Sequence, residues 1–324
     1  MNKIIFWLKA ARVHTLPMSF MSWLVVFCFA VKQNGNIILG IITLFGIMLA
    51  HLGVNLIDDY FDYKNEVKTI TSSEEKKQIK MQKGKCQYII NGSATLNQTL
   101  FAAITFFGLA AIIGLTLTVI CGWQVAAIAL LASIFCMSYP KLTYIGLSEL
   151  AVGLTFAPFL FVGTYFVMTG ILSIKILLLS ISTGLLTVGL LHTHAIMDYD
   201  FDIKDNKKTL CTILGSKEKS IVALGIMMFL AYLNIAIGVT LKLFPPQTLL
   251  TFLTIPLAIS LIYLMNLNRL FPEVITDRKF WMGPMENWEE IKTNNAQNFM
   301  IRFYISRNIM VFFSLFLCIG IIFS

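Results

Sequence analysis

Two acidic segments of this 324-residue sequence share one pattern of residues. Residues 58–64 (DDYFDYK) and 198–204 (DYDFDIK) agree at their first, fourth, fifth and seventh positions, and a Lys-Thr pair follows each at the same distance. Each segment comes directly after a long apolar run, where carboxylates cost free energy unless they pair or bind a metal. We therefore predict that the two segments share one purpose, the binding of a divalent metal and a diphosphate.

The spacing of the aspartates indicates which of them act together. Asp58 and Asp62 are four residues apart, as are Asp198 and Asp202, so each pair lies on one face of a helix. Carboxylate oxygens suit Mg²⁺ better than zinc or copper, and Mg²⁺ usually binds through one or two carboxylates plus substrate phosphates. Two facing pairs are therefore typical of a site in which metal ions bridge to a diphosphate.

Other polar residues extend the first of these faces. Asn55 comes one helical turn before Asp58, and Glu66 comes one turn after Asp62. Asp59 lies on a different side of the same helix, although a widened turn would bring it within reach of a metal.

Basic residues near the segments are candidates to neutralise diphosphate oxygens. Lys68 and Lys208 recur at matching positions, and Arg12 and Lys141 come from other connections expected on the same side of the membrane. Loops on that side are also rich in lysine for reasons of topology alone, so both roles stay open for each lysine.

The composition shows which elements must position these residues. The sequence is 57% hydrophobic and 13% charged, with a mean hydropathy of +0.78, whereas soluble domains have roughly 25% charged residues. Apolar stretches near the ~20 residues that span a bilayer recur along the chain. They lie at 17–32, 36–57, 99–119, 122–138, 149–170, 174–197, 219–240, 247–265 and 303–323. We predict an all-α integral membrane protein with about nine transmembrane helices.

The topology follows from the number of helices between the two acidic segments. Four stretches separate them, so both segments end on the same face of the membrane, unlike the copies of an inverted repeat. We predict one membrane-embedded domain over 1–324, a bundle of two parallel pseudo-repeats at about 17–145 and 146–324. The longest connections, 59–98 and 266–302, lie on the face that carries the acidic segments.

The basic residues sort strongly by side. With a cytoplasmic N-terminus, only Lys32, Lys175 and Lys242 of the 25 basic residues fall on the opposite side, which fixes the orientation by the positive-inside rule. We expect an inner (cytoplasmic) membrane protein with its site facing the cytoplasm and its C-terminus outside. The net charge of +8 therefore needs no nucleic-acid partner.

The sequence resembles the UbiA superfamily of intramembrane prenyltransferases over nearly its whole length. The family's first motif, NDxxDxxxD, corresponds to residues 58–66, and its second motif, DxxxD, corresponds to 198–202. Asp58 stands where the family usually has Asn, and Glu66 stands where many members have Asp. Both substitutions keep an oxygen ligand.

Within the superfamily the sequence is most similar to the dihydroxynaphthoate prenyltransferases of menaquinone synthesis. Residues 7–17 (WLKAARVHTLP) resemble their WLxAxRxxTLP opening, and 55–62 (NLIDDYFD) resemble their NLxNDYFD motif. Residues 146–150 (GLSEL) are similar to their GLGEL segment. Their YxxxK element is represented by Tyr139, with Thr143 at the lysine position and Lys141 nearby.

The resemblance implies an enzyme that transfers a polyprenyl group from an allylic polyprenyl diphosphate to an aromatic acceptor, a naphthoate-type quinone precursor, and releases diphosphate. The residues implied in Mg²⁺ binding are Asp58, Asp62, Asp198, Asp202 and Glu66. Those implied in binding diphosphate or substrate are Asn55, Asp59, Arg12, Lys68, Lys141, Lys208, Tyr139, Glu149 and His194.

Three of these residues have structural roles as alternatives. The Tyr139 ring is a candidate to shield an allylic cation, or it packs within the membrane. Glu149 and His194 are polar residues at membrane depth that are placed to meet the acceptor. Glu149 could instead be a charge at a helix N-terminus, and His194 a hydrogen-bonded structural residue.

Other functions stay open at this point. A prenyltransferase with a different acceptor fits the same motifs. A metal-ion or phosphate transporter would carry acids along a midplane pathway, whereas here they gather near one interface. A non-catalytic homologue would bind prenyl diphosphate without releasing diphosphate.

Overall fold

The computed structural model describes residues 3–67 and 86–324, and every regular element in these ranges is a helix. The helices of the first half are α1 (Lys3–Ala10), η1 (Val13–Thr15), α2 (Pro17–Lys32), α3 (Ile37–Val67), α5 (Gln87–Ile90), α6 (Leu96–Cys121) and α7 (Trp123–Leu142).

The second half begins with a span built from three pieces. These are α8 (Ser148–Leu154), the π-helical turn η2 (Thr155–Phe159) and α9 (Leu160–Thr169). Pro158 lies inside η2, and because proline has no N–H to donate, it accounts for the irregular turn. The remaining helices are α10 (Ile174–Met197), α11 (Tyr199–Lys204), α12 (Leu210–Leu214), α13 (Lys217–Thr240), η3 (Pro246–Thr254), α14 (Ile255–Leu270), η4 (Phe280–Met282), α15 (Trp288–Thr293) and α16 (Gln297–Ile322).

The described residues confirm the predicted class. Eight spans are long and apolar enough to cross a membrane, and α7 adds a shorter apolar helix over Trp123–Tyr139. In this part of the chain they correspond one to one with the nine predicted stretches. The prediction of an all-α membrane protein with about nine transmembrane helices is therefore confirmed.

One connection begins later than the sequence suggests. The helix α3 has 31 residues, whereas about 20 span a hydrocarbon core, so its last turns extend beyond the apolar layer at ~1.5 Å per residue. The first acidic segment lies on this extension. The expected connection at 59–98 is thus helical as far as Val67.

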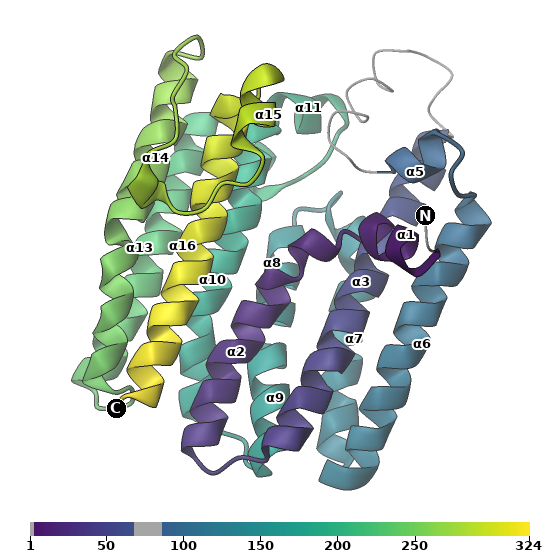
Figure 1. Cartoon of the computed structure of the whole chain (residues 1–324), viewed down its shortest axis with the longest axis vertical. Helices are drawn as coiled ribbons and strands as arrows, with labels where there is room; N and C mark the ends of the chain where they lie inside the picture. Colours follow the sequence, from purple (N-terminus) through teal and green to yellow (C-terminus); the bar gives the residue numbers. More distant parts are fainter. Residues whose placement is uncertain (1–2, 68–85) are drawn as a thin grey trace.

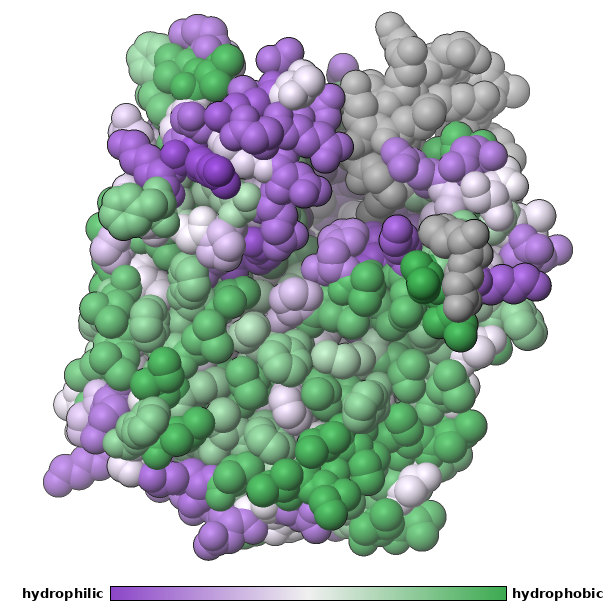
Figure 2. Space-filling view, viewed as in Figure 1, coloured by the Kyte–Doolittle hydropathy of each residue, from purple (hydrophilic) through white to green (hydrophobic). Residues whose placement is uncertain are grey.

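The two acidic segments lie at the same end of the molecule. Figure 1 shows α3 and α10 both running toward the end that carries α5 and α11, which we call the motif end. The chain's C-terminus, after α16, lies at the opposite end, which we call the far end. Figure 2 shows hydrophilic residues gathered at both ends and a broad hydrophobic band between them. This arrangement fits a bundle that crosses a bilayer.

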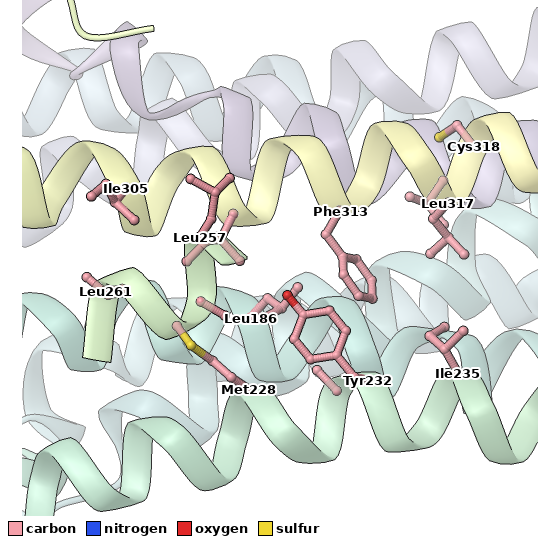
Figure 3. Close-up of a cluster of buried hydrophobic side chains, with 14 of the residues drawn as sticks. Leu186, Met228, Tyr232, Ile235, Leu257, Leu261, Ile305, Phe313, Leu317 and Cys318 are labelled. Carbon is pink, nitrogen blue, oxygen red and sulfur yellow. The ribbon is translucent and has the colours of Figure 1, made fainter. Parts of the chain in front are cut away.

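The main core lies among the helices of the second half and α2. Figure 3 shows part of it, where Phe313 of α16, Tyr232 of α13 and Leu186 of α10 meet. Lipid tails are as apolar as these side chains, so close packing and interhelical hydrogen bonds hold such a core together. One example is Ser182, which donates to the backbone oxygen of Ala231 at 2.9 Å.

Candidate active site

The first acidic segment places two carboxylates inside the protein. Asp58 is 6% exposed and Asp59 1% exposed, whereas Asp62, one turn further along α3, is half-buried. Burial of a charged carboxylate costs free energy unless a cation or several hydrogen-bond donors accompany it. The surroundings of Asp58 and Asp59 must therefore supply compensating charge.

Arg12 supplies this charge from the turn between α1 and η1. Its Nη2 atom lies 3.1 Å from Oδ2 of Asp58 and 3.1 Å from Oδ1 of Asp59. The same atom donates to the backbone oxygen of Asn55 at 2.8 Å. Burial opposes the guanidinium charge, but attraction by Asp59 and Asp58 outweighs it and raises the pKa of Arg12. Arg12 therefore lies directly against the first motif, although it comes from a different connection.

The Nε–H group of Arg12 is buried and has no hydrogen-bond partner in the described ranges. A charged donor that lacks an acceptor is costly inside a protein. A diphosphate oxygen is the kind of acceptor that would satisfy it. The missing acceptor for this N–H group therefore favours an anionic ligand beside the first motif.

The backbone at Arg12 is held in an unfavourable conformation. Its φ of 58° lies in the left-handed region of backbone conformations, which residues other than glycine rarely adopt. Two hydrogen bonds fix this turn: the Asn55 amide donates to the Ala11 carbonyl at 2.9 Å, and the Thr15 hydroxyl donates to the Arg12 carbonyl at 2.9 Å. Asn55 thus holds the Arg12 turn to α3, which is a direct structural role for a predicted binding residue.

His51 supports this turn from one helical turn deeper in α3. The Thr15 hydroxyl gives its only proton to Arg12 and also accepts from the Asn55 amide at 3.0 Å. His51 Nε2, 3.3 Å from the same hydroxyl, must then be the donor. Its Nδ1 is left to accept from the Ser19 hydroxyl. A neutral histidine thus links α2, α3 and the Arg12 turn.

The sequence reasoning missed His51, Thr15 and Ser19. A usable signal was present, because His51 stands four residues before Asn55 and seven before Asp58, on the same helical face. A histidine deep in an apolar helix is also costly unless it is hydrogen-bonded.

The short helix α5 closes over the first motif. The Cys86 thiol donates to the backbone oxygen of Asp59 at 3.4 Å. Burial, together with the nearby negative charge of Asp59, raises the pKa of Tyr88. Neither residue was singled out from the sequence. A long connection separates both of them from α3, and the spacing of residues along the chain does not predict contacts over such a distance.

The second acidic segment spans a helix break that preserves the predicted spacing. The helix α10 ends at Met197, Asp198 caps it, and α11 begins at the next residue. The backbone N–H of Asp202 nevertheless donates to the Asp198 carbonyl at 2.9 Å, so the two aspartates remain one turn apart. Asp202 is 7% exposed and Asp198 is half-buried.

Asp200 of the same segment points away from these two residues. It is exposed and forms an ion pair with Lys217 at 2.6 Å. Its surroundings therefore differ from those of Asp202, which is buried.

Glu149 and Lys208 lie where two connections of the motif end meet. The Lys208 backbone N–H donates to the Thr143 carbonyl at 2.9 Å, and the Leu210 N–H donates to Oε1 of Glu149 at 2.8 Å. Oε2 of Glu149 accepts from the Ser148 hydroxyl at 2.8 Å. Glu149 is 7% exposed. The structure thus gives Glu149 a supporting place at the start of α12, next to the second motif.

Tyr139, Lys141 and His194 complete the predicted set. Tyr139 is near Arg12, in the last turn of α7. Lys141 is exposed at the end of α7. The His194 ring stacks on Phe303 of α16, with ring centroids 4.9 Å apart, and its buried Nε2 has no hydrogen-bond partner among the residues described.

Two predicted residues are not settled by the structure. Lys68 lies outside the described residues. Glu66 belongs to α3, but its side chain also lies outside what is described.

The carboxylates at this end fit Mg²⁺ by their chemistry, since they offer hard oxygen ligands. Within residues 3–67 and 86–324, no three histidine, cysteine or acidic side chains form a group that could hold a metal by themselves. An ion bound there would need further oxygens. The phosphates of a substrate are a usual source for Mg²⁺.

The fold and the site together define a helical membrane protein with paired aspartate motifs at one end of its bundle. The UbiA prenyltransferase family matches residues 19–282, and the protein belongs to this family. It is therefore an integral membrane prenyltransferase.

Two curated relatives are similar in sequence. One is the 1,4-dihydroxy-2-naphthoate octaprenyltransferase of Bacillus subtilis (strain 168), 24% identical over 255 residues that cover 76% of this chain and 78% of the relative. The other is the 2-carboxy-1,4-naphthoquinone phytyltransferase of Synechocystis sp., 33% identical over 143 residues that cover 43% of this chain and 45% of the relative.

Solved structures share the fold. A UbiA homologue from Aeropyrum pernix K1 has a TM-score of 0.65 at 14% identity, covering 94% of this chain and 97% of its own. A UbiA homologue from Archaeoglobus fulgidus bound to GPP and Mg²⁺ has a TM-score of 0.58 at 14% identity, covering 98% of this chain and 99% of its own.

Proposed function

We propose that the protein transfers a polyprenyl group from an allylic polyprenyl diphosphate to an aromatic acceptor of the naphthoate type, with Mg²⁺ and at the cytoplasmic face of the cell membrane. The names of the two curated relatives support the acceptor class. The sorting of basic residues supports the orientation, because all the basic residues of the described ranges except Lys32, Lys175 and Lys242 belong to the motif end.

One observation carries the proposal for the donor. Arg12 is clamped against Asp58 and Asp59 while its buried Nε–H lacks a partner among the described residues. A diphosphate accepts this hydrogen bond, and the aspartates beside it offer oxygens for the metal that accompanies the diphosphate.

The proposed metal-binding residues are those of the two acidic motifs. Asp58, Asp62, Asp198 and Asp202, with Glu66, are the residues that we expect to hold Mg²⁺. When bound, Mg²⁺ supplies Lewis-acid stabilisation of the leaving diphosphate.

The protein's own side chains bind and orient the donor. Arg12 donates to a diphosphate oxygen, and Lys68, Lys141 and Lys208 add positive charge where the leaving group becomes more negative. The allylic C–O bond breaks, and the diphosphate leaves with the electron pair. A ring carbon of the acceptor forms the new C–C bond, and its proton passes to the released diphosphate or to water. Tyr139, which is near Arg12, is our candidate to shield the allylic carbon through its ring face.

The helix-walled interior keeps water from the reacting carbon. His194 lies one turn before Asp198 with an unpartnered nitrogen in the described ranges, which makes it our candidate for contact with the acceptor.

The test uses purified protein with Mg²⁺, labelled prenyl diphosphates of several lengths and a panel of aromatic acceptors. We expect Asp62→Asn and Asp202→Asn each to lower the rate of transfer by about 10²-fold or more. Asp200→Asn is the matched control for the second motif, because Asp200 belongs to the same short helix but is exposed and paired with Lys217.

The control should keep a rate within about twofold of the wild type. Full activity of either Asp62→Asn or Asp202→Asn at limiting Mg²⁺ would contradict a site shared by both motifs. Transfer to non-naphthoate acceptors alone would contradict the proposed acceptor class.

A further inference from the structure

The far end of the bundle carries positive charge without negative side chains. The connections there join α2 to α3, α6 to α7, α9 to α10 and α13 to η3, and none of them contains aspartate or glutamate. The basic residues of this end are Lys32, Lys175 and Lys242. In the described part of the chain, no ion pair joins any of them to a side-chain carboxylate.

These three lysines line a single open cavity of about 380 Å³. They reach it from the end of α2, the first turn of α10 and the connection after α13. The volume lies in the range of about 300–1,000 Å³ that is usual for small-molecule sites. Figure 2 shows hydrophilic surface at this end, at the lower left of the molecule.

The rest of the cavity wall is mainly apolar. Phe29 of α2, Phe244 and Pro245 before η3, and Ile321 of α16 face the same space. The cavity thus combines a cluster of ammonium groups with a hydrophobic lining at the depth where the apolar helices end. A ligand that matches both properties is itself amphipathic.

Two of the lysines are held in place by the backbone. Lys32 Nζ donates to the carbonyl of Ile322 at 3.2 Å and to a backbone oxygen of Ser324, the last residue of the sequence. Lys242 follows the end of α13 with a φ of 57°, and Leu243 N–H returns to the Gly238 carbonyl at 2.8 Å. Helices usually close in this way with glycine in the left-handed position. A lysine there keeps a charge at the cavity despite an unfavourable backbone conformation.

We propose that this cavity binds the phosphate headgroup of an anionic phospholipid from the leaflet at the far end. An anion in the cavity would meet the positive charge of Lys175 and Lys242, which no described ion pair neutralises, as well as that of Lys32. A lipid phosphate is present at this depth, and its glycerol and acyl parts match the apolar wall. A soluble phosphate would meet the same lysines but would gain nothing from Phe29, Phe244 or Ile321.

The experiment measures lipid retention by full-length protein in neutral detergent, using native mass spectrometry and thermal unfolding. Phosphatidylglycerol, phosphatidylcholine and inorganic phosphate are added in separate arms. We expect phosphatidylglycerol to be retained over phosphatidylcholine by about tenfold or more, since each lysine strengthens binding to anionic lipid several-fold. Inorganic phosphate at the same concentration should leave the unfolding temperature unchanged.

The variants separate this cavity from general attraction to positive charge. The triple variant Lys32→Gln, Lys175→Gln, Lys242→Gln should lose the preference for phosphatidylglycerol. A control that removes the same charge from exposed lysines near the motif end carries the changes Lys3→Gln, Lys219→Gln and Lys279→Gln.

The control should keep the preference, as should the charge-preserving triple Lys→Arg variant of the cavity, which also guards against misfolding. Equal loss in the cavity variant and the control would overturn the proposal. So would the absence of any preference in the wild type, or equal stabilisation by inorganic phosphate.

Discussion

The sharpest test of the site is the replacement of Arg12, because its positive charge compensates the negative charge of the first motif. In Arg12→Gln, two carboxylates whose side chains are 9% and 1% exposed lose the cation that they share. Removal of one partner of a buried ion pair typically costs about 3–5 kcal/mol. Because the Arg12 side chain is itself 19% exposed, water compensates part of this loss, and we expect about 3 kcal/mol.

A double-mutant cycle measures the interaction directly. The free energies of unfolding of Arg12→Gln, Asp59→Asn and the double variant are obtained in detergent without added metal. The coupling energy between Arg12 and Asp59 should be about 1.5–3 kcal/mol, the usual contribution of a hydrogen bond to a charged group. The single variant Arg12→Gln should unfold roughly 4–5 °C below the wild type, because the entropy of unfolding of a chain of this length is large.

The control for this cycle is an exposed pair. Lys292 lies 3.4 Å from Glu289, whose side chain is 79% exposed, so Lys292→Gln should change the stability by less than about 1 kcal/mol. A coupling energy below about 0.5 kcal/mol between Arg12 and Asp59 would refute the reasoning, because the two groups would then not share a buried interaction.

Two further predictions follow from other parts of the structure. His51→Leu should lower kcat/KM for the prenyl diphosphate at least about tenfold more than His192→Leu does, while the two variants lose similar stability. Both histidines are hydrogen-bonded inside the bundle, but only His51 supports the Arg12 turn. Equal losses of kcat/KM in the two variants would contradict this prediction. Burial raises the pKa of Cys211 to about 11, so its thiol stays protonated at pH 8 and should resist iodoacetamide there, with modification increasing only as the pH approaches 11 or the protein unfolds. Rapid modification of folded protein at pH 8, detected by mass spectrometry, would show that this segment opens.

The local pattern predicted much of the molecule because membrane helices follow simple rules. The backbone N–H and C=O groups of a membrane span must form hydrogen bonds within the span, which makes it a helix. Length and hydropathy alone therefore indicate the number of helices and their approximate positions. The four-residue spacing of Asp198 and Asp202 survived even the break between α10 and α11, since one helical hydrogen bond bridges it. The predicted end of the second apolar stretch came too early for α3, because a helix can continue into water, where its residues are no longer apolar.

The sequence by itself determined the class of the protein, the two aspartate motifs and the side of the bundle to which they belong, because these depend on local periodicity and on the sorting of charge. Only the tertiary structure decided that Arg12 is clamped between Asp58 and Asp59, that His51 braces that turn, and that Glu149 supports the start of α12. The same holds for the meeting of Lys32, Lys175 and Lys242 at one cavity. Each of these contacts joins residues far apart in the chain, and such distances are set by how the helices pack, which no local spacing records.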